Sequence, residues 1–384
     1  MISLSFAVST PEVELLLSAS CRYQKAFTEQ QIARLAGMPI DWPYVLGQAR
    51  RHGVVPLLYH NLCTYALAQV PHSVRAELGA LYRDSALRNL YLLGELLKIV
   101  TRLERRGIRV IPFKGPLLAS SAFGDVSLRQ FSDLDILVAE QDIDVASAQL
   151  SEMGFRCAHR AEWVQPYLRF GHELDFDRDH DHARVDLQWR FAKKWVSFPV
   201  DVGAVWERSV VVQVGDISVR QPCPEDGLII LCAHAYRHGW SHLKWISDVQ
   251  AFVHVLGPGL DWPQLSERAR ESGGQRLLAL GLWLAQALGG SDLPEPAAQL
   301  ASQDVTVEEL GRNVLARLFN SANPIGPRGS AGLLADLAFH LQARERMKDR
   351  FPIMKPLFEH ADYLARRYGR HYARRLFGST VLSR

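Results

Sequence analysis

Two aspartates in an otherwise apolar segment set the first chemical expectation. Residues 134–138 have the sequence LDILV, the composition of a buried β-strand. Because side chains alternate across a strand, the apolar ones share one face and Asp133 and Asp135 lie together on the other, with β-carbons roughly 6 to 7 Å apart. Two such carboxylates repel each other and resist burial. A divalent cation between them, with Mg²⁺ the natural candidate, would relieve both effects.

A third carboxylate follows in a second alternating segment, RVDLQW at residues 184–189. The strand GHELDF at 171–176 precedes it, and the polar segment 177–183 between the two is typical of a hairpin tip. The histidines and aspartates of this tip offer a transition-metal site as an alternative, although a solvated turn is the commoner structure. Asp186 joins the first pair only if its strand pairs in the sheet with the strand of Asp133.

A strand, helix, strand unit must carry the aspartate pair. RVIPF at 109–113 is another apolar run, and Lys114 and Gly115 form a turn before a helix that begins at Pro116. A Gly-Asp break separates this helix from the strand of the aspartate pair. A further helix over 140–153 follows that strand, an order typical of mixed α/β structure.

Helical periodicity flanks this mixed region on both sides. We expect a helical cap region over 1–106, a mixed α/β core over 107–222 and a C-terminal helical region over 223–384. The cap region includes a long helix over 73–106. Its apolar residues at helical spacing are Leu87, Leu90, Leu93, Leu97 and Val100.

One pattern occurs in both helical regions. DWPYVLGQARRHG begins at Asp41, and DWPQLSERARESG begins 220 residues later at Asp261. In each, an aspartate precedes a proline-started helix and a glycine follows it. Two related helical units and chance similarity both explain a match this short.

Composition favours a globular chain with more than one packed unit. The chain has 384 residues, of which 48% are hydrophobic. We expect no signal peptide, because the N-terminus lacks a basic leader, and no transmembrane segment, because the longest apolar run, 277–288, is too short. The five cysteines form no Cys-x-x-Cys motif, which argues against a zinc knuckle and a disulfide framework. A reduced, cytoplasmic setting fits.

The net charge of +3 hides a basic C-terminal tail. Residues 344–384 contain eleven Lys or Arg and four acids, a net charge of +7, so the remaining residues carry −4. Arginines and tyrosines interleave over 363–375, as they would on a surface that binds nucleic acid or anionic lipid. A solvated helix face is the commoner explanation.

Together these motifs carry a resemblance. They are Lys114-Gly115, a Gly-Asp break, Arg129, SDLDILV, VDLQW and a helical HxxxHGWxxLxWIxD that starts at His234. In this order they resemble the uncharacterised nucleotidyltransferase family of the polymerase-β-like superfamily. The resemblance covers about residues 57–252, more than half of the chain. It implies an α+β fold, with a small mixed sheet of that superfamily's type flanked by N-terminal and C-terminal helical regions.

The resemblance also implies roles for individual positions. Asp133 and Asp135 match the paired metal ligands of the superfamily. Asp186 matches its third carboxylate, which completes the second metal site and helps to activate the acceptor hydroxyl. The implied cofactor is Mg²⁺ or Mn²⁺.

Other positions are matched to the nucleotide. Lys114 and Gly115 stand where the superfamily usually has a Gly-Ser turn that holds the triphosphate, and this family has Lys-Gly there. A glycine lets backbone N–H groups approach phosphate, and a lysine adds a positive charge. Arg129 is placed to reach a phosphate or to brace the aspartate pair. Gln188 stands where many relatives have His, so no base or ligand is assigned there. Accessory candidates, which packing explains more commonly, are His234, His238 and Asp248.

The implied reaction moves a nucleoside monophosphate from a nucleoside triphosphate, such as ATP, to a hydroxyl or phosphate of a small-molecule or peptide acceptor, by a two-metal mechanism. Relatives are often encoded with polysaccharide or peptide tailoring genes, which allows such an acceptor. Two alternatives stay open. The same site could transfer a sugar from a nucleotide sugar, or the chain could be an inactive relative that binds nucleic acid or protein through its basic tail.

Overall fold

Five helices precede the sheet. The computed structural model describes residues 10–159, 161–192, 200–289, 292–319 and 330–350, so most of the basic tail, including 363–375, lies outside the described residues. The first helices are α1 (Pro11–Ala19), α2 (Ala26–Ala36), α3 (Trp42–His52), α4 (Val55–Tyr65) and α5 (His72–Glu104). Local chemistry sets their ends: the side chain of Thr10 accepts a hydrogen bond from the N–H of Val13 at the start of α1, and Gly53, with φ +68°, ends α3.

The central sheet is small and mixed. Its elements in chain order are β1 (Ile111–Pro112), α6 (Gly115–Phe123), η1 (Val126–Leu128), β2 (Leu134–Leu137), η2 (Glu140–Asp142), α7 (Ile143–Glu152), β3 (Arg156–Cys157), α8 (Ala161–Leu168), β4 (Glu173–Arg178) and β5 (Ala183–Gln188). The strands lie in the order β1-β2-β5-β4-β3. Strands β2 and β5 pair in parallel, and the other neighbours pair antiparallel. The predicted hairpin of 171–189 is therefore the β4–β5 pair.

Helices dominate the rest of the chain. The remaining elements are α9 (Val202–Arg208), β6 (Val210–Val214), β7 (Ile217–Gln221), α10 (Pro224–Arg237), α11 (Leu243–Leu256), η3 (Gly257–Gly259), α12 (Trp262–Ser272), α13 (Gln275–Leu288), α14 (Glu295–Ser302), α15 (Val305–Leu318) and α16 (Ser330–Gln342). Strands β6 and β7 form a separate two-stranded sheet. The fold is α+β, as predicted.

The two faces of the central sheet differ in kind. One face is apolar: Ile136 of β2, Leu187 of β5 and Phe176 of β4 join one hydrophobic cluster with residues of α5 and α7. The opposite face carries the acidic side chains and a small apolar cluster that includes Ile230 of α10. Helices α5 and α7 therefore cover the core face, and the acidic face is turned toward α10.

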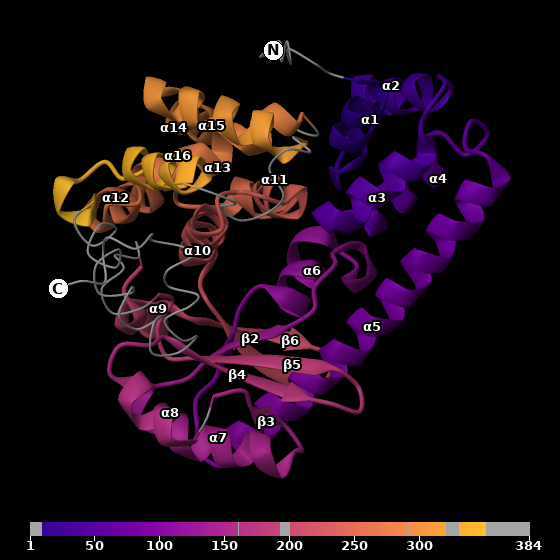
Figure 1. Ribbon diagram of the computed structural model, residues 1–384. Coiled ribbons are helices and arrows are strands. Elements are labelled where there is room, and N and C mark those ends of the chain that lie inside the picture. The colour runs from indigo at the N-terminus through magenta and orange to yellow at the C-terminus, as the bar shows by residue number, and fades with distance from the viewer. Residues whose placement is uncertain (1–9, 160, 193–199, 290–291, 320–329, 351–384) are drawn as a thin grey trace.

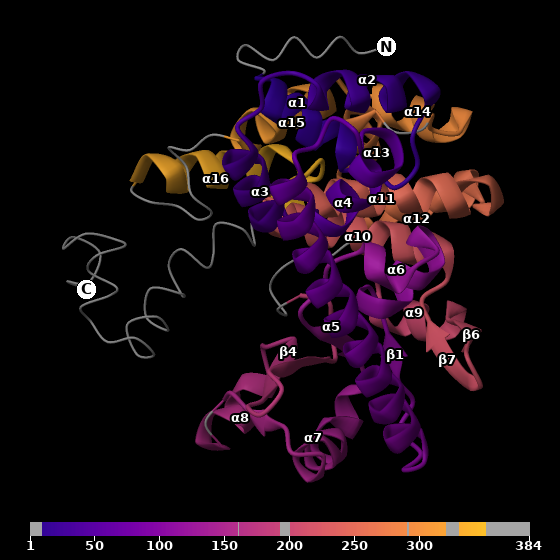
Figure 2. The same ribbon diagram turned by 90° about the vertical axis from the view of Figure 1, so that its right-hand side faces the viewer.

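Figures 1 and 2 show the same arrangement from two sides. Helices α1–α4 and α10–α16 gather in an upper helical body, and the sheet with α7 and α8 lies below it. Helix α5 runs alongside both parts, and α6 lies between them (Figures 1 and 2). A single large hydrophobic cluster contains buried residues of both the N-terminal and the C-terminal helices. The acidic face thus looks into the junction between the sheet and the helical body.

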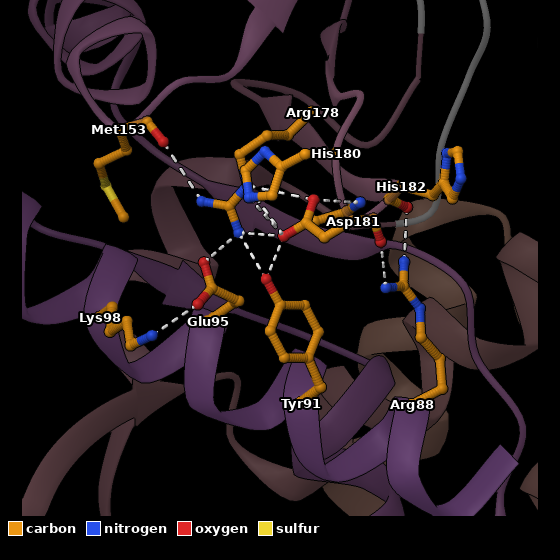
Figure 3. Close-up of polar contacts among 10 residues, drawn as sticks. Arg88, Tyr91, Glu95, Lys98, Met153, Arg178, His180, Asp181 and His182 are labelled. Atoms are coloured by element: carbon orange, nitrogen blue, oxygen red, sulfur yellow. Dashed lines mark hydrogen bonds and ion pairs between the residues drawn. The ribbon is translucent and has the colours of Figure 1, made fainter. Parts of the chain in front are cut away.

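Helix α5 is fastened to the β4–β5 hairpin by a buried polar network (Figure 3). Arg178 donates hydrogen bonds to Glu95 at 2.5 Å, to Asp181 at 2.6 Å and to the hydroxyl of Tyr91 at 2.9 Å. Tyr91 in turn donates to Asp181. Asp181 sits in the hairpin tip, so the tip is held to α5 by ion pairs rather than standing free in solvent.

The apolar stripe predicted for this helix is partly wrong. Leu87 and Leu90 are 67% and 54% exposed. Val100 of the predicted stripe is buried and Leu97 packs beside it, but the other side chains that α5 buries against the sheet were not predicted: Leu92, Leu96, Ile99 and Leu103. Both stripes have helical spacing in the sequence, and only the position of the sheet decides which one is covered. Among the described helices, none combines the length and apolar composition that a membrane span requires.

Candidate active site

Three aspartates form a row across three adjacent strands. Asp135 of β2 is the direct partner of Asp186 of β5, and Asp186 is the direct partner of Asp175 of β4. Directly paired residues point to the same face of a sheet. Asp133 lies two residues before Asp135 and shares that face. The predicted convergence of Asp186 on the first two aspartates is therefore confirmed.

The carboxylates of these neighbouring aspartates repel one another. Burial, followed by the charges of Asp135 and Asp133, raises the pKa of Asp186 to about 8. Burial likewise raises the pKa of Asp135, and the neighbouring Lys114 opposes this rise. A carboxyl whose negative form is disfavoured in this way gains most when a cation arrives. The arrangement is therefore suited to binding positive charge.

Arg184 bridges two members of the row. Its Nε donates to Asp186 at 3.2 Å, and its Nη2 donates to Asp175 at 3.0 Å. Asp175 also lies 3.6 Å from the Nε2 of His159. The hydrogen bond with His159, together with Arg184, lowers the pKa of Asp175 to about 2. Although Arg184 contacts both carboxylates, the charged form of Asp175 is favoured and the charged form of Asp186 is disfavoured.

The turn before α6 aims Lys114 at the row. Lys114 has φ +60° and ψ −143°, and Gly115 has φ +43°, so two successive residues lie at positive φ. A side chain is rarely accommodated there, which explains a glycine at 115. The ammonium of Lys114 lies 3.0 Å from Oδ1 of Asp135. It also lies 3.1 Å from Nδ1 of His234.

Gln188 has a structural role that the sequence did not indicate. Its side-chain amide donates a 2.9 Å hydrogen bond to Oδ1 of Asp135. Gln188 is buried and lies two residues after Asp186 on the same strand, and therefore on the same face of the sheet. The amide and Lys114 therefore hold the same carboxylate oxygen from two sides.

Arg129 is locked by Asp248. Its Nε and Nη2 donate to the two carboxylate oxygens of Asp248 at 2.7 and 2.8 Å, and both side chains are buried. The sequence left Arg129 either to reach a phosphate or to brace the aspartate pair. Its bracing partner is instead Asp248 of α11. Its third nitrogen, Nη1, is buried and has no hydrogen-bond partner among the described residues.

His234, in the last turn of α10, and His238, which caps that helix, pack with each other and with an aromatic residue. The rings of His234 and His238 lie 4.7 Å apart, and His238 stacks on Trp245 at 5.2 Å. Burial, with the charge of Lys114 next, keeps the pKa of His234 well below its ordinary value. A neutral His234 can accept a hydrogen bond from Lys114, so it positions that lysine.

Two further residues escaped the sequence analysis. Lys244 of α11 is a half-buried lysine one helical turn before Asp248. Glu173 of β4 is the strand partner of Gln188 and lies on the acidic face, and burial raises its pKa. The one available signal for Lys244 was its i, i+4 spacing with Asp248, which is common on helix surfaces.

Three of the carboxylates on the acidic face suit a hard divalent cation. Asp133, Asp135 and Asp186 supply carboxylate oxygens on one face, and their mutual repulsion favours a shared cation. In the part of the chain that the structure describes, no three His, Cys, Asp or Glu side chains are already arranged as a metal site. Lys114 and Arg184 hold Asp135 and Asp186 instead. Cation binding would require these two side chains to move.

A small cavity adjoins the turn that contains Lys114. It is lined by Lys114 and by mostly apolar side chains, among them Leu117, Ile230 and Phe252. None of the three aspartates of the metal-binding hypothesis lines it. The lining of this cavity therefore includes Lys114 but not the aspartates that contact it or lie near it.

The structure therefore brings three aspartates of a mixed sheet together beside a Lys-Gly turn. The family model described as "Uncharacterised nucleotidyltransferase" matches residues 38–290, about two thirds of the chain, and the chain belongs to this family. The match includes every candidate site residue named above. A search of curated proteins finds no match. The protein is thus an enzyme that transfers nucleotidyl groups.

Proposed function

We propose that this enzyme transfers a nucleoside monophosphate from a nucleoside triphosphate to a hydroxyl or phosphate of a small-molecule or peptide acceptor, with Mg²⁺ or Mn²⁺ as cofactor. One observation supports it above others. Asp135 and Asp186 are direct partners on adjacent parallel strands, with Asp133 on the same face. Such a set of acids suits a cation-dependent phosphoryl site and serves no evident packing purpose.

The three aspartates would hold the cofactor. Asp133, Asp135 and Asp186 present hard oxygen ligands, which magnesium and manganese prefer. In the two-metal scheme of this superfamily, the bound ions stabilise the charge of the attacking and leaving oxygens during in-line displacement. Gln188 keeps one oxygen of Asp135 oriented through its 2.9 Å hydrogen bond. Asp186 would also accept the hydrogen bond of the acceptor hydroxyl.

Lys114, Gly115 and Arg129 would bind the phosphates. The positive φ of Gly115 turns the chain tightly ahead of α6, and backbone N–H groups at such a turn can approach phosphate closely. Lys114 would exchange its contact with Asp135 for a phosphate oxygen when nucleotide and cation enter. Arg129 has one nitrogen without a hydrogen-bond partner, and Asp248 keeps the guanidinium plane fixed.

The test compares wild type with Asp135→Asn. Each of four nucleoside triphosphates is supplied with and without Mg²⁺, and both pyrophosphate release and binding of a fluorescent nucleotide are measured. We expect Mg²⁺-dependent binding and turnover in wild type. Turnover should be abolished in Asp135→Asn while the protein still unfolds in one cooperative transition, because relief of the repulsion with Asp186 offsets part of the loss of the ion pair with Lys114. Asp216→Asn, in the exposed β6–β7 turn, is the matched control.

Other outcomes select the alternatives. Equal turnover of wild type and Asp135→Asn would overturn the metal-ligand assignment. Release of a nucleoside diphosphate from a nucleotide sugar, without use of a triphosphate, would favour sugar transfer. A wild type that binds neither cation nor nucleotide, but does bind RNA or protein, would favour a non-catalytic relative.

A further inference from the structure

Three cationic side chains gather at the junction between the sheet and the helical body. Lys114 forms an ion pair with Asp135 at 3.0 Å, and Arg129 forms one with Asp248 at 2.7 Å. The third is Lys244, for which no ion pair occurs within the described ranges of the chain. Each of the first two has a carboxylate of its own, so the cluster holds one positive charge more than its close pairs neutralise.

Helix α11 places Lys244 beside the locked arginine. Lys244 is the second residue of α11, and Asp248 lies one turn later on the same face. Asp248 is the residue that grips Arg129. Lys244 therefore lies on the side of this ion pair nearer the start of α11, where the helix dipole adds partial positive charge. Trp245, the next residue, packs against His234, which contacts Lys114.

The N-terminal helices hold the stem of this lysine. Gly53 ends α3 with φ +68°, and a Cβ placed there would lie 2.9 Å from Cδ of Lys244. The aliphatic stem thus crosses the glycine, and a side chain at 53 would displace it. Burial, and then the charge of Arg129, lowers the pKa of Lys244, while Asp248 and Asp133 oppose this effect. An ammonium packed next to like charges is best stabilised by an incoming anion.

A second donor without a partner lies in the same cluster. Arg129 is 7% exposed, and its Nη1 is buried with no hydrogen-bond partner among the described residues. Native proteins rarely leave a charged donor buried and unpaired. Arg129 comes from the segment before β2 and Lys244 comes from α11, so the two donors approach from different parts of the fold. A ligand with several anionic oxygens would satisfy both.

We propose that Lys244, at the start of α11, is a nucleotide-binding residue. Its ammonium contacts the triphosphate together with Nη1 of Arg129. This inference rests on the proposed function and names a residue that the sequence motifs did not. If Lys244 had a purely structural role, another unbranched side chain could replace the stem that packs on Gly53 without loss of phosphate binding.

The experiment therefore separates charge from stem. Lys244→Met keeps an unbranched apolar stem and removes the charge, and Lys244→Arg restores the charge. Lys348→Met, at an exposed position, is the matched control. Binding of inorganic tripolyphosphate is measured by calorimetry without added metal, and KM and kcat for the triphosphate are measured with Mg²⁺. Melting temperatures check the fold.

We expect Lys244→Met to weaken tripolyphosphate binding and to raise KM roughly ten- to a hundredfold, with a smaller change in kcat, as loss of one charge-assisted contact implies. Lys244→Arg should recover most of the affinity, and Lys348→Met should match wild type. Unchanged tripolyphosphate affinity in Lys244→Met would overturn the inference, as would a wild type that binds no polyphosphate. Failure of the proposed function is distinguishable, because it removes pyrophosphate release while Lys244-dependent binding of tripolyphosphate persists.

Discussion

Asp186 stands between two other carboxylates, and its protonation is the most sensitive property of the site. Its strand partners are Asp135 on one side and Asp175 on the other. His159 and Arg184 lower the pKa of Asp175, and Arg184 contacts Asp186 as well, yet burial and the charges of Asp135 and Asp133 still raise the pKa of Asp186 to about 8. At neutral pH without a cation, the row therefore retains a proton that a bound cation would displace.

The first prediction concerns pH and stability. The pKa of Asp186 is about 8 in the folded protein against an ordinary 3.8, so between these values the folded state binds more protons than the unfolded state. Its contribution to the free energy of unfolding is full below pH 3.8 and is lost as the pH rises through 8, by up to about 1.4 kcal/mol per pH unit. Urea unfolding of wild type and Asp186→Asn from pH 5 to 8 in EDTA measures this contribution. The free energy of unfolding of wild type minus that of Asp186→Asn should fall as the pH rises, and a constant value would contradict the assignment.

The second prediction concerns Lys114. Its ammonium contacts both Asp135 and His234 in the nucleotide-free protein. Because we expect it to bind phosphate equally in the ground state and the transition state, Lys114→Ala should raise KM for the triphosphate about tenfold or more with a smaller loss of kcat. Steady-state kinetics with varied nucleotide measures both constants. An unaltered KM would show that the lysine does not reach the phosphates.

At the scale of elements, α5 shows how packing overrides local pattern. The helix has apolar residues on two faces, and the sheet covers the one that includes Leu96 and Ile99. Leu87 and Leu90 remain exposed on the other. The covered face also buries Glu95, which a hydrophobic pattern cannot anticipate. Arg178 compensates this charge across the interface between α5 and β4 (Figure 3).

The third prediction tests this fastening. Glu95 and Arg178 are both almost fully buried, so removal of Arg178 leaves the buried carboxylate of Glu95 with the exposed Lys98 as its remaining ion-pair partner among the described residues. Arg178→Met should lower the free energy of unfolding by about 3 to 5 kcal/mol. The matched control is Arg156→Met, because the ion pair of Arg156 with Asp179 in the turn after β4 is highly exposed and should contribute little. Urea denaturation measures both variants, and equal small losses would show that the network is dispensable.

At the scale of the whole molecule, the two helical regions are built alike. Helices α1–α4 contact one another in the same pairs as helices α10–α13. The repeated sequence pattern forms α3 and α12, in which Asp41 and Asp261 accept a hydrogen bond from the N–H of the third residue of each helix. Gly53 and Gly273 both end their helix in the left-handed region. Of the two explanations left open for this pattern, related units therefore gain support.

Longer-range contacts repeat as well. Glu12 of α1 accepts a hydrogen bond from the N–H of Asp41 at 3.1 Å, and Glu225 of α10 accepts one from the N–H of Asp261 at 3.2 Å. The two helical units contribute different residues to the junction. The C-terminal unit supplies His234, Lys244 and Asp248 to the junction, whereas the N-terminal unit supplies Gly53, on which the stem of Lys244 packs.

The fourth prediction concerns the bond between the core and this C-terminal unit. Arg129 and Asp248 are 119 residues apart and form a buried, two-point ion pair. Asp248→Asn should lower the free energy of unfolding by about 3 to 5 kcal/mol, because Arg129 stays buried without its counter-charge. Arg129→Met combined with Asp248→Leu should recover much of this loss, since no buried charge remains. Chemical denaturation of wild type, Arg129→Met, Asp248→Leu and the double variant completes a double-mutant cycle, and additive losses would exclude a coupled pair.

The sequence by itself determined the local features of this protein. The alternation in LDILV and RVDLQW placed Asp133, Asp135 and Asp186 opposite the apolar side chains, and the order of periodicities indicated the α+β class. Asp-Trp-Pro and glycine signals located both ends of α3 and α12. These features follow from residue spacing along one strand or helix, which the order of residues specifies directly.

Only the tertiary structure decided which distant groups meet. Lys114 reaches His234 across 120 residues, and Lys244 lies beside the pair of Arg129 and Asp248 because α11 packs against α6 and against the end of α3. Such neighbours depend on how helices and sheet cover one another, and each element has more than one face that local spacing would allow. Burial of one particular face, rather than the spacing itself, selects the partners of every charge in the site.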